Sequence, residues 1–162
     1  MAKRLPPNPN EALEYGHWNI ELCGEFDPRD NLAFVYAVHL KDGCKYIGVK
    51  KFWQIVKKPP NEFVRGPNRK LKEHKWRSYN TSSSILKETL EDEIEERYIL
   101  GVFSKWGTAL MAEFIWQFEL DALRQEHFLN FQMGGTFTRS TYPDELIYER
   151  IDEYKKRFKY DL

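Results

Sequence analysis

Glu113 has the most unusual setting of any residue in this sequence. From Ala109 to Phe118 the chain is apolar except for Glu113 and Gln117, which lie four residues apart and would share one face of a helix. A carboxylate is costly to remove from water unless a cation or another polar group meets it. The partner could be a metal ion, an arginine, or water at the edge of a cleft. Because structural ion pairs outnumber metal sites, the residues alone favour an ion pair with a lysine or arginine.

A second candidate for chemistry is a pair of tyrosines, Tyr36 and Tyr46, ten residues apart. Asp42-Gly43 between them is a strong signal for a tight hairpin turn, because both residues tolerate positive φ. Adjacent antiparallel strands would bring the two rings within reach of each other. Aromatic side chains on a sheet usually belong to a core, and the pair by itself favours that interpretation.

Charge is unevenly distributed, although the 25 Lys and Arg residues of this chain of 162 balance its 25 Asp and Glu residues. The segment from Lys50 to Arg77 is rich in basic residues and contains only two acids, Glu62 and Glu73. Basic and aromatic residues on an irregular segment are typical of binding to a phosphate backbone, whereas a solvated loop is the simpler alternative. The residues that we predict to contact DNA here are Lys50, Lys57, Lys58, Arg65, Arg69, Lys70, Lys72, Lys75 and Tyr79.

The hydrophobic pattern predicts the elements that would position these residues. β-Favouring runs predict strands over residues 34–40, 44–49 and 97–103. Apolar spacing predicts a helix that begins behind residues 81–84 and reaches Ile94, and a long helix over about 108–129. A last amphipathic helix over 144–158 would place Leu146, Ile147, Ile151 and Tyr154 on one side. The basic segment is expected to be a long loop with one helical turn near 69–74, and the order of elements predicts a small α/β fold.

The motifs in these segments resemble those of the GIY-YIG nuclease superfamily. Phe34-Val35-Tyr36 and Tyr46-Ile47-Gly48 stand where that superfamily carries its two defining motifs. Residues 45–53 are similar to the Tyr-Ile-Gly-x-Lys-Lys-x-Phe pattern of a phage-associated branch, and residues 76–83 to its Trp-x-x-Tyr-x-Gly-Ser-Ser motif. Glu113 and Asn130 match, in order and approximate spacing, a glutamate on the next long helix and an asparagine about four turns later.

The resemblance implies an α/β fold whose small three-stranded antiparallel sheet is flanked by helices. It covers about residues 33–132 of the chain. We therefore expect a nuclease domain over residues 33–135, an N-terminal arm over 1–32 and a C-terminal helical extension over 136–162.

The resemblance also implies a function, that of a metal-dependent DNA endonuclease with Mg²⁺ or Mn²⁺ as cofactor. Glu113 would be the protein ligand of the metal, a hard cation that takes few carboxylates and keeps several waters. Tyr36 would be the general base or a phenol that orients water, and Tyr46 would position the phosphate. The implied catalytic residues are Tyr36, Tyr46, Lys51, Arg77, Glu113 and Asn130.

The sequence departs from the family pattern at three places. Phe34 stands in place of the first motif's glycine, and Asn80-Thr81 replaces the usual x-Gly before Ser-Ser. The arginine that the family carries after the second motif has no counterpart at its common place, so Lys51, Arg77 or Arg65 would supply its charge. Asn130 would bind the phosphate or hold the surroundings of Glu113.

Two alternatives to an active nuclease remain open at the level of sequence. One is a catalytically degenerate module of the same fold that binds DNA or inhibits a partner, and the other is a nucleic-acid-packaging protein. No apolar run is long enough for a membrane span, and two cysteines cannot form a disulfide framework. We expect a cytoplasmic protein, in a host cell if phage-encoded, and double-strand cleavage would require a homodimer.

Overall fold

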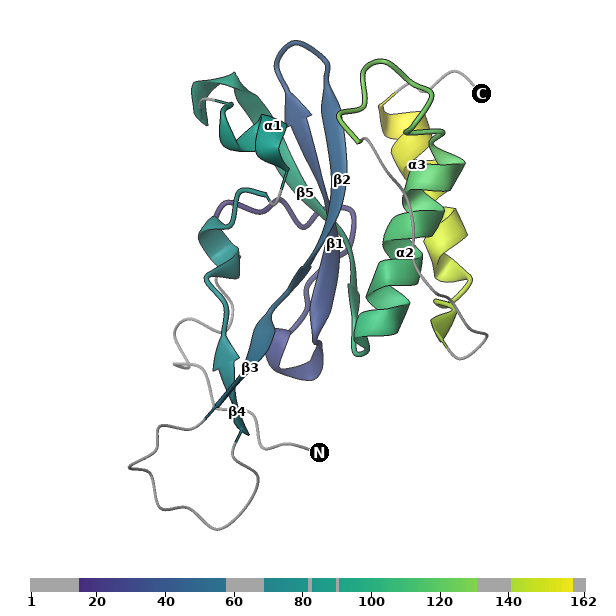
Figure 1. Ribbon diagram of the computed structural model, residues 1–162. Helices are drawn as coiled ribbons and strands as arrows, with labels where there is room; N and C mark the ends of the chain where they lie inside the picture. Colours follow the sequence, from purple (N-terminus) through teal and green to yellow (C-terminus); the bar gives the residue numbers. More distant parts are fainter. Residues whose placement is uncertain (1–14, 58–68, 82, 90, 131–140, 159–162) are drawn as a thin grey trace.

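The computed structural model describes residues 15–57, 69–81, 83–89, 91–130 and 141–158 (Figure 1). Its centre is an antiparallel sheet of three strands in the order β2-β1-β5, formed by β1 (Ala33–Leu40), β2 (Lys45–Lys51) and β5 (Ile94–Phe103). The fold class predicted from the sequence, an α/β fold with a small three-stranded antiparallel sheet and flanking helices, is confirmed.

The β1–β2 hairpin follows the predicted turn. Gly43 has a φ of 92°, which the missing Cβ permits, and the backbone N–H of Cys44 donates to Asp42 Oδ1 at 2.8 Å. The resulting register places Tyr36 opposite Gly48 and Val38 opposite Tyr46. Because directly opposed residues share a face, both tyrosines and Gly48 lie on the same side of the sheet.

Two helices, α2 (Trp106–Glu119) and α3 (Leu146–Arg157), lie side by side against one face of the sheet (Figure 1). The predicted C-terminal helix is therefore present, but Leu146 is 44% exposed and does not share the buried side predicted for it. Because α3 contributes its buried side to the central core, it packs within its own chain. The core on this face includes Val35, Ala37, Ile47, Leu100, Ala112, Ile115, Trp116, Ile147, Ile151 and Tyr154.

The opposite face of the sheet carries a core made mostly of aromatic rings. Trp18 belongs to it, and the indole N–H of Trp18 donates to the carbonyl of Trp76 at 2.7 Å. Next to Trp18, Asn19 forms a parallel bridge to Tyr98 on the outer edge of β5. The large buried residues of this face are Trp18, Phe34, Tyr36, Phe52, Trp53 and Trp76.

The prediction of a long basic loop is wrong for its described part. Residues Trp53–Lys57 form β3 and residues Arg69–Glu73 form β4, which pair as an antiparallel ribbon. The β-favouring run Trp53-Gln54-Ile55-Val56 explains the first strand, and pairing satisfies backbone groups that a loop would leave to water. The predicted helical turn near 69–74 is absent, and the described turn is a 3₁₀ turn at Trp76–Ser78.

The helix predicted to reach Ile94 is also much shorter than expected. Only α1 (Ser84–Lys87) is helical in the α sense, a 3₁₀ turn follows at Glu91–Glu93, and β5 already begins at Ile94. Ile94 pairs with Leu40 of β1, so sheet pairing along the hairpin overrides the helical spacing.

The long helix likewise ends at Glu119 instead of reaching residue 129. Asp121 adopts a φ of 54°, which turns the chain. Residues 127–129 then run beside the outer edge of β2, where the N–H of Lys45 donates to the carbonyl of His127 and the N–H of Leu129 donates to that of Lys45, both at 2.7 Å. Within the described residues, no helix is long and apolar enough to cross a membrane.

Candidate active site

Three tyrosines from separate segments meet on the aromatic face of the sheet. The ring centroids of Tyr36 and Tyr46 are 6.1 Å apart, and those of Tyr36 and Tyr79 are 6.0 Å apart. The phenol of Tyr36 crosses directly over Gly48, where a Cβ would lie 2.5 Å from the Tyr36 hydroxyl and 2.8 Å from the Tyr46 ring. Glycine in the second motif therefore has a physical reason, which is the space that the Tyr36 ring occupies.

Tyr36 is fully buried, and burial raises the pKa of its phenol well above its usual range, with Tyr46 and Tyr79 adding to the effect. Its hydroxyl lies 3.4 Å from Oγ1 of Thr81, which also accepts the N–H of Ser83 at 3.0 Å. Thr81 was not predicted as a site residue. The signal that pointed to it was the departure of Asn80-Thr81 from the family motif.

Glu113 lies on α2 with its carboxylate half-buried. Its Oε1 accepts a hydrogen bond from Nε2 of Gln117 at 3.2 Å. Burial raises the pKa of the Glu113 carboxyl to about 7, which the bond from Gln117 partly opposes. Across the described residues no lysine or arginine forms an ion pair with Glu113, so the ion pair that the residues alone favoured is not found there.

Asn130 is buried and bound to the second motif itself. Its Oδ1 accepts the N–H of Ile47 at 3.0 Å, and its Nδ2 donates to the carbonyl of Ile47 at 2.7 Å. The same carbonyl accepts Nε2 of Gln117 at 3.2 Å. Asn130 is thus connected to Glu113 through Ile47 and Gln117, and both polar atoms of its amide are engaged with β2.

The predicted basic catalytic residues lie in different surroundings. The ammonium of Lys50 stands 4.3 Å from the centroid of Tyr79, beside the tyrosine cluster, whereas that of Lys51 stands 4.5 Å from the centroid of Trp106 at the start of α2. Arg77 donates to Glu73 at 2.6 Å and stacks on Trp76. Because Lys50 and Lys51 are neighbours in β2, Lys50 shares the face of the tyrosines, whereas Lys51 lies on the face that α2 covers.

Arg97 is a buried cation that was not predicted as a site residue. It is 5% exposed, and its guanidinium binds Glu91 and, at 2.9 Å, Oδ1 of Asn80. Its Nε has no hydrogen-bond partner among the described residues. Asn80 and Thr81 are the residues that depart from the family motif. Together they connect Arg97 to Tyr36, because Asn80 binds Arg97 and the adjacent Thr81 lies beside the Tyr36 hydroxyl.

The residues predicted to contact DNA are distributed over the β3–β4 ribbon and the turn behind it. Lys57, Arg69, Lys70 and Lys72 belong to the ribbon, which extends away from the central sheet (Figure 1). Lys72 and Lys75 are exposed. Lys58 and Arg65 lie outside the described residues.

The donor set fits one hard cation held by a single carboxylate. In the described part of the chain no three His, Cys, Asp or Glu residues converge as a metal cage. Glu113 offers its second oxygen, for which no partner is found among the described residues, and a hard cation such as Mg²⁺ would take its other ligands from water or a phosphate. The geometry therefore suits a metal that shares its ligands between this chain and a phosphate.

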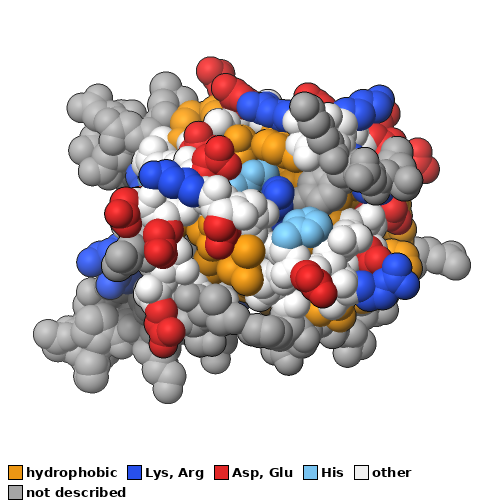
Figure 2. Space-filling model, turned by 90° about the horizontal axis from the view of Figure 1, so that it is seen from above, with side chains coloured by type: hydrophobic (Ala, Val, Ile, Leu, Met, Phe, Trp, Pro, Cys, Tyr) orange, Lys and Arg blue, Asp and Glu red, His pale blue; other side chains and the backbone are white. Residues whose placement is uncertain are grey.

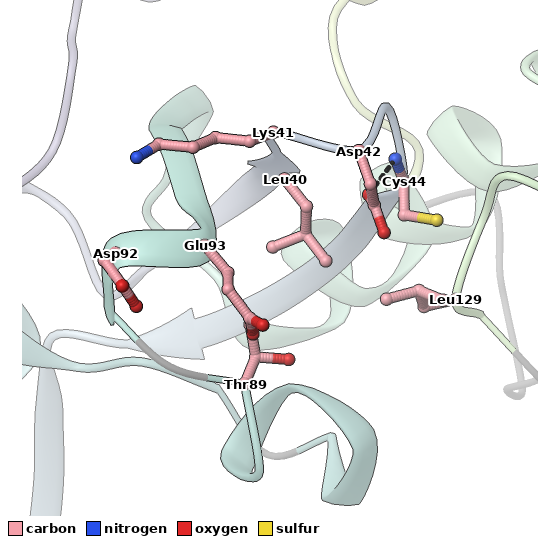
Figure 3. Close-up of a pocket in the computed structure, with 8 residues that line it drawn as sticks. All are labelled: Leu40, Lys41, Asp42, Cys44, Thr89, Asp92, Glu93 and Leu129. Atoms are coloured by element: carbon pink, nitrogen blue, oxygen red, sulfur yellow. Dashed lines mark hydrogen bonds between the residues drawn. The ribbon is translucent and has the colours of Figure 1, made fainter.

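A hollow of about 400 Å³, whose lining includes none of the predicted catalytic residues, lies beside the β1–β2 turn (Figure 3). Leu40 and Leu129 line it together with the acids Asp42, Asp92 and Glu93. Seen from that end, acidic and basic side chains alternate around hydrophobic patches (Figure 2). The described residues of this end therefore form no continuous positive surface for a polyanion.

Comparison with known proteins gives two matches. The family model described as "Putative endonuclease segE, GIY-YIG domain" matches residues 18–133. The chain is 33% identical over 115 residues to "Intron-associated endonuclease 2" of Enterobacteria phage T4, which covers 71% of this chain and 38% of that relative. The chain thus spans about two fifths of the length of this curated relative. No solved structure matches.

Proposed function

Since this chain belongs to the SegE-type GIY-YIG nuclease family, as its motifs predicted, we propose that it is a metal-dependent endonuclease that hydrolyses phosphodiester bonds in DNA. The observation that carries the proposal is the half-buried Glu113 carboxylate. It has no cationic partner in the described residues, and it hydrogen-bonds to a glutamine that also binds the strand of Tyr46.

In this proposal Glu113 holds Mg²⁺ or Mn²⁺ with its free oxygen. The bound metal would offset negative charge on the phosphate and on the leaving oxygen. Tyr46, which is more exposed than Tyr36, would bind the phosphate. Tyr36 keeps its proton because its pKa is raised, so we assign it a hydrogen-bonding role that orients water and its neighbouring phenols in place of proton abstraction.

The remaining positive charge would come from Lys50, Lys51 and Arg77. Lys50 lies beside Tyr79, and Lys51 stands at the start of α2. Arg77 forms an ion pair with Glu73. It would stabilise the negative charge of the phosphate either after this ion pair breaks or through the electric field of the ion pair. Asn130 would hold β2 and Glu113 in register through Ile47, since its amide is already occupied.

The DNA would lie along the basic β3–β4 ribbon and the turn that carries Lys75 and Tyr79. The matched relative comes from a phage, and we extend this to a phage-encoded enzyme that acts on DNA in the host cytoplasm. One site of this kind cuts one strand, so double-strand cleavage would need two copies of the chain.

The test is nicking of supercoiled plasmid by the purified chain. We expect nicking with Mg²⁺ and none with EDTA. Glu113→Ala should lose activity by a factor of about 10²–10³, because the proposed protein ligand of the metal is removed. Glu119→Ala, an exposed carboxylate at the end of the same helix, should retain activity. Undiminished nicking by Glu113→Ala would contradict the role of Glu113.

A second candidate function keeps the fold and the DNA but not the chemistry. The complete burial of Tyr36 and the engagement of Arg77 with Glu73 favour a degenerate DNA-binding module. Plasmid binding without metal-dependent cleavage, in a preparation shown to be folded by circular dichroism, would decide for this candidate.

A further inference from the structure

Gln117 occupies a position between the metal-ligand candidate and the strand of the second motif. It lies one turn after Glu113 on α2, and its side chain is 4% exposed. Its Nε2 carries two protons and has two acceptors at 3.2 Å, Oε1 of Glu113 and the carbonyl of Ile47. The side-chain amide therefore joins the helix to the strand at one point.

The carbonyl of Ile47 is itself held in place. Ile47 lies between Tyr46 and Gly48, and its N–H and C=O point to the outer edge of β2, where the Asn130 amide binds both. The side chain of Ile47 is fully buried against α2. The acceptor that Gln117 uses is thus a fixed point next to Tyr46, and not a mobile loop carbonyl.

We propose that Gln117 is a positioning residue that fixes the orientation of the Glu113 carboxylate relative to Tyr46. This role rests on the proposed function, in which Glu113 binds the metal. By binding Oε1, Gln117 restrains rotation of the carboxylate and would leave Oε2 available to the metal. Outer partners of this kind commonly change metal affinity by a factor of about 10 to 100 when removed.

The test measures Mn²⁺ binding by the DNA-free protein, from the loss of the free-ion signal in electron paramagnetic resonance. Gln117→Met keeps the side-chain length and removes the donor, and it should weaken Mn²⁺ binding about tenfold. In nicking assays the same variant should lower kcat and leave KM for plasmid unchanged. Ile115→Val, a buried change on the same helix, should leave Mn²⁺ affinity unchanged and controls for lost stability.

The outcomes separate this inference from the proposed function. If Glu113→Gln leaves Mn²⁺ binding intact, the proposed metal ligand is wrong. If Glu113→Gln abolishes binding while Gln117→Met matches the wild type, the metal ligand stands and the positioning role is overturned.

A measurement on the wild-type protein covers the case in which Gln117→Met does not fold. In a Mg²⁺ titration followed by NMR, the side-chain amide signals of Gln117 should shift with the same half-saturation as the carboxyl carbon of Glu113. Gln117 signals that stay in place while the carboxyl carbon of Glu113 moves would overturn the proposal.

Discussion

The hydroxyl of Thr81 links a turn to the buried phenol of Tyr36, and we expect the stability of the protein to depend on it. Thr81→Val keeps the shape of the side chain but leaves the Tyr36 hydroxyl and the N–H of Ser83 without this partner. We expect a loss of about 1–3 kcal/mol in the free energy of unfolding, measured by urea denaturation. Thr81→Ser retains the hydroxyl and should lose clearly less. Similar losses in both variants would argue against the hydrogen bonds.

Gly48 is a second sensitive residue, because a Cβ there would lie 2.5 Å from the Tyr36 ring. Gly48→Ala should displace the Tyr36 ring, destabilise the protein by about 1–3 kcal/mol and reduce nicking. Gly101→Ala in β5 is the matched control, because its Cβ would lie farther from its nearest neighbour, the Phe103 ring at 3.1 Å. Thermal unfolding and plasmid nicking of both variants check this, and equal tolerance at the two glycines would contradict it.

What could be predicted for single residues depended on their sequence context. Glu113 stood out because its neighbours are apolar, and Tyr36, Tyr46 and Asn130 because they lie in motifs. Arg97 gave no such signal, since its partners Glu91 and Asn80 come together only through folding.

The contact of His39 in β1 with α3 should make the stability of the protein depend on pH. It is buried, and its Nε2 lies 2.5 Å from the hydroxyl of Tyr154. Burial, with smaller effects from Lys45 and Arg157, lowers the pKa of His39 to about 3. In the unfolded chain, His39 binds a proton near pH 6.5. Between pH 6.5 and the folded pKa, each pH unit toward acid therefore lowers the free energy of unfolding by about 1.4 kcal/mol.

Glu113 has the opposite effect on the free energy of unfolding over nearly the same pH range. Its folded pKa of about 7 lies above the ordinary value of 4.5, so the metal-free fold gains stability as the pH falls from 7 toward 4.5. We therefore expect the two effects to offset each other in the wild-type protein. Urea denaturation at pH 7, 6 and 5 should show Glu113→Gln losing stability toward acid and His39→Gln gaining it. Parallel curves for the two variants would contradict both assignments.

The elements predicted from the sequence were reliable where local and long-range preferences agree. The β1–β2 hairpin has both a turn signal and β-favouring strands, and α3 has clear helical spacing. The pairing of β3 with β4, the early start of β5 and the end of α2 depend on partners far along the chain. Helical spacing around Leu86 and Ile94 was real in the sequence, but Ile94 is buried more favourably beside Leu40 in the sheet.

The distribution of charge over the molecule predicts the salt dependence of DNA binding. Lys72 and Lys75 are exposed at the base of the β3–β4 ribbon. Replacing both with Gln should reduce the slope of log Kd against log salt by about 2, since each phosphate contact contributes about 0.9. Lys87 and Lys156, which are exposed on α1 and α3, form the control pair. Fluorescence anisotropy with a duplex measures the slopes, and an equal reduction for both pairs would mean that the ribbon has no special role.

The site as a whole could be predicted only in part. Five short motifs in order were enough to identify the family, and the family model that matches residues 18–133 extends to Trp18 in the aromatic core. The contact of Lys50 with Tyr79 could not be predicted, because it joins two segments that lie far apart in the sequence.

Both outer strands of the central sheet have a short segment beside them, Asn19 next to β5 and Phe128 next to β2. An uncovered strand edge is a template on which another chain can add, and such growth leads to aggregation. Here the backbone groups that would start this growth are occupied around Tyr98 and Lys45 by the protein's own chain. Self-association by continuation of the central sheet is blocked at those points.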